Sequence, residues 1–87
     1  SGRYSGQVMD QTLATVFMNP DNAGLKAAFE KATKCSIEVS TFGSTIVFGT
    51  DVKENVQLIE TALGMLSEQL TVPDDRLQQV LKEFNFG

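Results

Sequence analysis

The feature that most constrains the fold is a long apolar seam in the second half of the chain. Apolar residues recur there at alternating steps of four and three, at Val52, Val56, Ile59, Leu63, Leu66 and Leu70. This spacing places them on one face of a helix of about five turns. Asp51 and Glu54 resemble a capping box and predict its start, and Pro73 predicts its end. A helix with such a face needs a second layer to cover it.

The sequence before this helix supplies a helix and a hairpin. Residues 22–34 carry one apolar stripe at helical spacing, and Asp21 or Asn22 is the expected cap of that helix. Residues 36–40 alternate polar and apolar, and residues 45–48 are rich in β-branched and aromatic side chains. The glycine-containing segment 41–44 lies between these two runs, which predicts a β-hairpin.

The first part of the chain is predicted to hold one more strand. Residues 12–18 are apolar on both faces of an extended chain and partly β-branched, which favours a strand that ends before Pro20. Residues 1–11 are interpreted as a flexible lead-in and residues 12–87 as the folded domain. A short last helix is expected after Asp74, with its apolar stripe at Leu77, Val80, Leu81 and Phe84.

These elements predict a single small α+β domain. Their order is strand, helix, strand, strand, long helix and short helix, which suits a three-stranded antiparallel or mixed sheet with helices packed on one face. The 87 residues give room for one modest core. The long seam is read as the core face of its helix, with a dimerising coiled coil as the alternative.

Charge gives no general attraction for nucleic acid. The chain has 11 acidic and 7 basic residues and a formal net charge of −4, so its surface repels phosphate on average. The clustered cations are Lys26, Lys31, Lys34 and Lys53, with acidic residues interleaved among them. They are interpreted as a solvated face, with weak RNA or acidic-peptide contact through Lys26, Lys31 and Lys34 as the alternative.

The residue types that most often carry catalysis are scarce in this chain. The chain has no histidine and one cysteine, Cys35, so the usual zinc sites and nucleophile–base pairs cannot be assembled. No glycine-rich phosphate loop is present. We therefore expect no enzyme activity, no metal and no cofactor. The single cysteine favours a reducing compartment such as the cytoplasm, and no apolar run is long enough for a membrane.

The stretch from Leu25 to Leu66 resembles one family. Its helix ends near a threonine, an Ile-x-Val strand follows, and a second strand ends in glycine before a long helix. The matching residues are Thr33, Ile37, Val39, Ile46, Phe48 and Gly49. This succession resembles a type I KH domain over most of residues 12–70. The resemblance implies an RNA-regulatory protein that acts in post-transcriptional regulation.

One departure from the KH pattern bears on function. KH domains hold four nucleotides with a GxxG loop between their first two helices. That position is occupied here by Pro20, Asp21, Asn22, Ala23 and Gly24, with no GxxG and one acidic side chain. Degenerate KH-like domains, such as those of the Bicaudal-C family, stand beside RNA-binding KH domains. The resemblance thus implies a scaffold or protein-contact role, with RNA binding indirect or weak.

Several aromatic and apolar residues are not explained by the predicted core. They are Phe42 at the hairpin tip, Met65 off the main seam, and Phe84 and Phe86 near the end. We interpret them as candidate interface residues, although they could also pack back onto the domain. The expected partner is another protein or a neighbouring KH domain of the same chain. The alternatives are weak single-stranded RNA binding beside the helix at 22–34, or a homo-oligomerising adaptor of an unrelated α/β fold.

Overall fold

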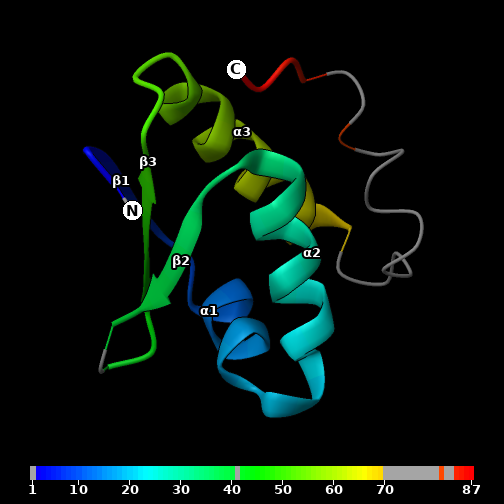
Figure 1. Ribbon diagram of the computed structural model, residues 1–87. Helices are drawn as coiled ribbons and strands as arrows, with labels where there is room; N and C mark the ends of the chain where they lie inside the picture. Colours follow the sequence, from blue (N-terminus) through cyan, green and yellow to red (C-terminus); the bar gives the residue numbers. More distant parts are fainter. Residues whose placement is uncertain (1, 41, 70–80, 82–83) are drawn as a thin grey trace.

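The computed structural model describes residues 2–40, 42–69, 81 and 84–87. Its strands are β1 (Tyr4–Met9), β2 (Ser36–Val39) and β3 (Thr45–Thr50), and its helices are α1 (Gln11–Met18), α2 (Ala23–Thr33) and α3 (Asn55–Glu68). The sheet is antiparallel with the order β1-β3-β2, and the helices lie on one side of it (Figure 1). The predicted α+β class is therefore confirmed.

The first element of the fold corrects two predictions. Tyr4–Met9, assigned to a flexible lead-in, is a six-residue strand paired along its length with β3. The segment 12–18, predicted as a strand, belongs to helix α1. The helix begins because the Asp10 carboxylate accepts the Leu13 N–H at 2.9 Å, an N-cap that satisfies a free donor. Leu13, Ala14 and Phe17 then bury one face of α1.

Strand β1 packs against its neighbour through a glycine. Gly6 lies opposite Phe48 in the antiparallel register, and a Cβ on Gly6 would overlap the Phe48 ring. The buried ring therefore requires a residue without a side chain at this point of β1. Tyr4 and Val8, on either side of Gly6, turn toward the helices and are half-buried.

The hairpin of β2 and β3 forms as predicted. Ile37 pairs with Phe48, and Val39 with Ile46, so that the apolar side chains of both strands face the helices. Gly43 in the connecting turn has a φ of 69°, a conformation that favours glycine. Lys34 also has a positive φ, 56°, where it ends α2 before β2 begins.

Helix α3 supplies the apolar face that the sequence predicts, but it begins later. It starts at Asn55 instead of near Asp51, and Glu54 at its N-cap makes no side-chain cap bond. The Asp51 carboxylate instead accepts the Arg3 N–H at 3.2 Å. The capping-box prediction is therefore wrong, because these two acidic residues belong to the β3–α3 connection.

The core lies between the sheet and the helices, and the seam of α3 faces it. The buried hydrophobic residues are Leu13, Ala14, Phe17, Leu25, Phe29, Ile37, Ile46, Phe48, Ile59, Ala62, Leu63, Leu66 and Leu81. The interpretation of the seam as a core face is thus confirmed for Ile59, Leu63 and Leu66. The short helix predicted after Asp74 falls largely outside the described residues.

Candidate functional site

The turn between α1 and α2 contains most of the segment 20–24, and its main-chain donors are used internally. Asn19 N–H donates to Val16 O at 3.3 Å, and Asn22 N–H donates to Asn19 O at 2.9 Å. The Asp21 N–H donates to the side-chain oxygen of Asn19 at 3.0 Å. Ala23 N–H donates to the carbonyl of Pro20, which itself has no N–H. From residue 19 to residue 23, no N–H is left for a phosphate.

The side chains that close this turn differ from those expected. Asn22 is the N-cap of α2 by position, yet it makes no side-chain cap bond. Its Nδ2 instead donates to Val16 O at 3.0 Å, which ties the turn back to α1. Asn19 caps the 3-10 turn Pro20–Asn22 and not α2. Asn22 is therefore the predicted N-cap of α2 by position, but the expected side-chain cap bond is not formed. Gly24 is the second residue of α2 and Asp21 is exposed on the turn.

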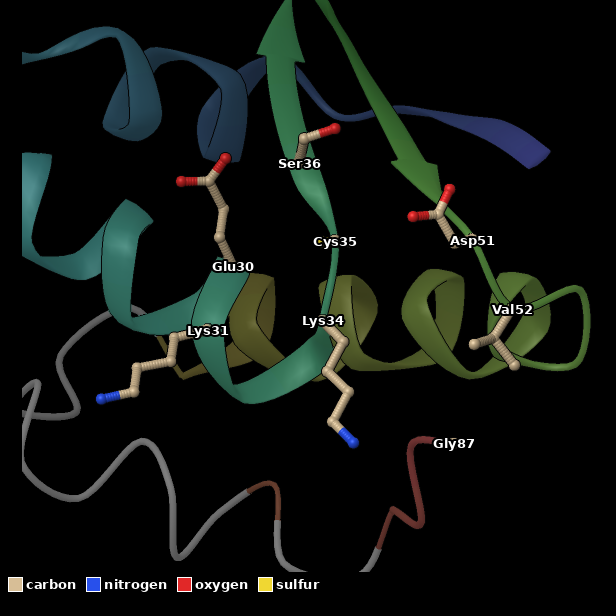
Figure 2. Close-up of a pocket in the computed structure, with 8 residues that line it drawn as sticks. All are labelled: Glu30, Lys31, Lys34, Cys35, Ser36, Asp51, Val52 and Gly87. Atoms are coloured by element: carbon tan, nitrogen blue, oxygen red, sulfur yellow. The ribbon is translucent and has the colours of Figure 1, made fainter. Parts of the chain in front are cut away.

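The predicted lysines do not form one cationic surface. Lys31 and Lys34 are exposed on the last turns of α2, whereas Lys26 is half-buried one to two turns earlier. A pocket of about 390 Å³ lies beside Lys31 and Lys34, and it contains both signs of charge. Figure 2 shows the two lysines extending away from Glu30 and Asp51, which line the same pocket. Among the residues that the structure describes, Lys31 and Lys34 thus share their pocket with two acidic side chains, which weakens the positive field there.

The edge of β2 beside α2 is occupied by a carboxylate. Glu30 Oε2 accepts the Ile37 N–H at 2.8 Å, so a side chain from α2 satisfies a main-chain donor on the free edge of the sheet. The alternative of weak RNA binding requires this groove between α2 and the hairpin. A negative charge placed there disfavours a phosphate backbone.

Cys35 is a half-buried thiol, and the described residues around it do not activate it as a nucleophile. Its Sγ lies 3.0 Å from the hydroxyl of Thr33, which in turn donates to Phe29 O at 2.8 Å. Burial raises the pKa of the Cys35 thiol, Glu30 adds to this increase, and the hydrogen bond with Thr33 opposes it. A thiol with a raised pKa is a poor nucleophile at neutral pH. Among the described residues, no cluster of acidic or cysteine side chains could hold a metal ion.

The predicted interface residues fall into separate environments. Phe84 and Phe86 stack with ring centroids 5.8 Å apart, and both are half-buried against the core. Met65 is half-buried on α3. Phe42 is 92% exposed at the tip of the hairpin. Of the four, only Phe42 is left as a fully exposed apolar side chain.

Sequence reasoning missed the two methionines that accompany Phe42. Met9 is 83% exposed at the end of β1, and Met18 is 53% exposed at the end of α1. Met18 reaches the hairpin turn, because a Cβ on Gly43 would lie 3.1 Å from its Sδ. Met9 directly precedes Asp10, whose N–H donates to Ser44 O in the same turn. Met9, Met18 and Phe42 are called the tip patch below. Because the sequence places Met9 in a lead-in and Met18 in a strand, no sequence pattern predicts this patch.

Comparisons with protein-family models, with curated proteins and with solved structures found no match. In the part of the chain that the structure describes, no helix has the length and apolar character needed to cross a membrane.

Proposed function

We propose that this chain is a non-catalytic, KH-like module of a larger RNA-regulatory protein, and that it works as a structural and protein-interaction unit. The order of elements supports the KH resemblance. Two helices precede the hairpin, and the turn that joins them lies at residues 19–22, where the resemblance requires the nucleotide-gripping loop. The single cysteine and its protonated, half-buried thiol suit a reducing compartment such as the cytoplasm.

The observation that carries the proposal is the closed α1–α2 turn. A GxxG loop holds phosphates with free main-chain N–H groups in a positively polarised setting. Here the N–H groups of Asn19, Asp21, Asn22 and Ala23 all have partners within α1 and the turn. The exposed Asp21 carboxylate adds repulsion. A KH-like fold with this turn retains its scaffold, but residues 19–23 offer no free N–H group to the nucleotide backbone.

The tip patch supports a role in protein contact. Its three apolar side chains stand at one end of the domain, and the adjoining turn residues that the structure describes are uncharged. An exposed aromatic residue with flexible methionines is typical of protein interfaces. The hairpin-turn residues 42–44 beside the patch carry no positive charge that would attract a phosphate backbone.

Titration with RNA tests the proposal. We expect the full chain to bind single-stranded RNA no more tightly than the non-specific range, with a Kd of about 10⁻⁴ M or weaker at physiological salt. Low-micromolar, saturable binding in the same buffer contradicts the proposal. In that case weak direct RNA binding by the domain becomes the better description.

A graft tests the family and the function together. Asn19→Gly, Pro20→Lys, Asp21→Ser and Asn22→Gly combined would open the turn and expose its N–H groups. If the rest of the KH groove is in place, RNA affinity should rise by at least about tenfold, although the lost caps will lower the melting temperature. Asp21→Ser alone is the matched control, because it removes the charge and leaves the turn closed. Loss of stability without any gain in affinity contradicts the KH interpretation.

A further inference from the structure

Strand β1 has a free edge whose main-chain groups point away from the sheet. The Asp10 N–H donates to Ser44 O at 3.0 Å just beyond the paired residues of β1 and β3. Antiparallel pairs alternate between hydrogen-bonded and non-hydrogen-bonded residues. The even-numbered residues of β1 therefore bond to β3. Ser5, Gln7 and Met9 direct their N–H and C=O groups outward, and all three are exposed.

The outward main-chain groups on the two edges of the sheet differ in their hydrogen bonds. On β2, the Ile37 N–H is taken by the Glu30 carboxylate. On β1, no group within the described residues hydrogen-bonds to the outward main chain of Ser5, Gln7 or Met9. An edge strand of six residues with unpaired groups is a template for another strand. On β1, none of the outward main-chain groups of these three residues has a partner among the described residues, whereas on β2 the Ile37 N–H has one.

A groove runs beside the start of this edge. It has a volume of about 690 Å³ and lies between the first residues of β1 and the first turn of α3. Tyr4 and Val56 give it apolar surface, and Gln57 contributes an amide. Arg3 and Lys53 line it with positive charge, against one acidic residue, Glu54. The groove therefore favours a ligand with both apolar and acidic side chains.

The alternation of donors and acceptors along β1 identifies the class of ligand. A row of alternating N–H and C=O groups is complementary to the main chain of another extended polypeptide. A nucleic acid backbone presents acceptors without this alternation of donors. A second copy of β1 is a poorer match, because Tyr4–Met9 has no acidic residue and would bring a second Arg3 to the same edge.

The geometry points to strand addition: the free edge of β1 and the Arg3–Lys53 groove bind an extended acidic segment of a protein partner. The inference rests on the proposed protein-interaction function and names the surface and the chemistry of the partner. Main-chain pairing along Ser5 and Gln7 supplies the register. Arg3 and Lys53 select acidic side chains over basic ones.

A defined peptide tests the inference on the full chain. The probe is an acetylated and amidated hexapeptide of sequence Glu-Thr-Val-Glu-Val-Glu, and its control carries lysine in place of each glutamate. Chemical shifts and amide hydrogen exchange of the ¹⁵N-labelled protein are followed during titration. We expect saturable shifts around β1 and the start of α3, and slower exchange of the Ser5 and Gln7 amides, with the acidic probe only.

Two variants of one residue separate the main chain from the side chain. Gln7→Pro removes the outward N–H but no bond to β3, a position where an edge strand tolerates proline. Gln7→Pro should lower the affinity for the acidic probe by at least about tenfold. The affinity of Gln7→Ala should stay within about twofold of that of the unchanged protein. If Gln7→Pro does not fold, Arg3→Glu combined with Lys53→Glu provides the second test. This double substitution should lower the affinity for the acidic probe by about tenfold and raise the affinity for the lysine peptide.

The possible results are distinguishable. Equal shifts with both peptides, or unchanged exchange at Ser5 and Gln7, overturn the inference. Shifts confined to the tip patch overturn it as well, but they leave the protein-interaction function standing. Protection of Ser5 and Gln7 that grows with protein concentration, without peptide, assigns the edge to a second copy and also overturns it. Tight RNA binding in the separate titration contradicts the proposed function itself.

Discussion

The side chain of Asn55, the first residue of α3, holds the main chain of Gly87, 32 residues further along. Gly87 N–H donates to Asn55 Oδ1 at 3.0 Å, and Asn55 Nδ2 donates to Gly87 O at 3.4 Å. Asn55 is 1% exposed, so these two bonds satisfy the hydrogen-bonding groups of its buried side-chain amide. It also fixes the segment that carries the stacked rings of Phe84 and Phe86 against the core.

Asn55→Ala should therefore destabilise the domain. It leaves the Gly87 N–H and C=O without their partner and opens a small cavity, and the expected loss in the free energy of unfolding is about 1–3 kcal/mol. Urea denaturation followed by circular dichroism measures this loss. Gln57→Ala, at an exposed position of the same helix, should change it by less than about 0.5 kcal/mol. Equal values for the two variants would show that the Asn55–Gly87 bonds contribute nothing.

Phe29 is the centre of the packing between α2 and the rest of the fold. Its ring is fully buried and lies 6.1 Å from the ring of Phe17, centroid to centroid. Phe29→Ala should cost about 3–5 kcal/mol, a large share of the stability of a small domain. Thermal unfolding should show a much lower melting temperature or no cooperative transition, with Phe29→Leu between this variant and the unchanged protein. A Phe29→Ala melting temperature within a few degrees of the unchanged protein contradicts this role.

The burial of Phe29 follows from the sequence, but its contact with Phe17 does not. Periodicity identifies α2, the hairpin and the apolar face of α3, because each of these buries a regular stripe. Residues 12–18 have apolar side chains at helical and at strand spacing, and the β-branched ones favoured a strand. These residues form a helix because Asp10 caps the N-terminus of α1, and the importance of this local bond appears only in the structure.

Strand β1 was missed for a different reason. Tyr4–Met9 contains serine, glycine and glutamine, none of which is among the residues enriched in strands, and only Tyr4 and Val8 mark a buried face. The strand is held by pairing with β3, which lies more than 35 residues later, and Gly6 is required by the ring of Phe48. Such non-local contacts leave no periodic pattern in the sequence. Without β1, neither the tip patch nor the free edge could be predicted.

The carboxylate of Glu30 should stabilise the β2 edge. It accepts the Ile37 N–H at 2.8 Å, and a hydrogen bond to a charged acceptor is stronger than one between neutral groups. Glu30→Ala should lower the free energy of unfolding by about 1–3 kcal/mol and speed hydrogen exchange at Ile37. Glu38→Ala removes a carboxylate from the exposed face of the same strand and is the control. If the Ile37 amide exchanges at the same rate in both variants, the bond has no role in protecting the edge.

The raised pKa of Cys35 predicts a pH dependence of stability. Burial is the main cause, so the folded chain keeps the thiol protonated at pH values where the unfolded chain, near the usual 9.0, already loses the proton. The contribution of Cys35 is fully present below about pH 9 and is lost as the pH rises through the higher pKa of the folded state. Melting temperatures should therefore fall more steeply above pH 9 for the unchanged protein than for Cys35→Ala. Parallel pH profiles would contradict the shift.

Two glycines should respond in opposite ways to the same substitution. Gly64 lies on the exposed face of α3, and a Cβ there meets no atom of the described residues within 4 Å. Gly64→Ala should stabilise the domain by about 0.5–1 kcal/mol, since alanine loses less conformational entropy in a helix. Gly6→Ala should destabilise it, because the added Cβ displaces the Phe48 ring from the core or separates β1 from β3. Thermal unfolding of both variants measures the contrast. A stable Gly6→Ala variant would show that β1 is not packed on Phe48, and the free edge beside the Arg3–Lys53 groove would then lose its structural basis.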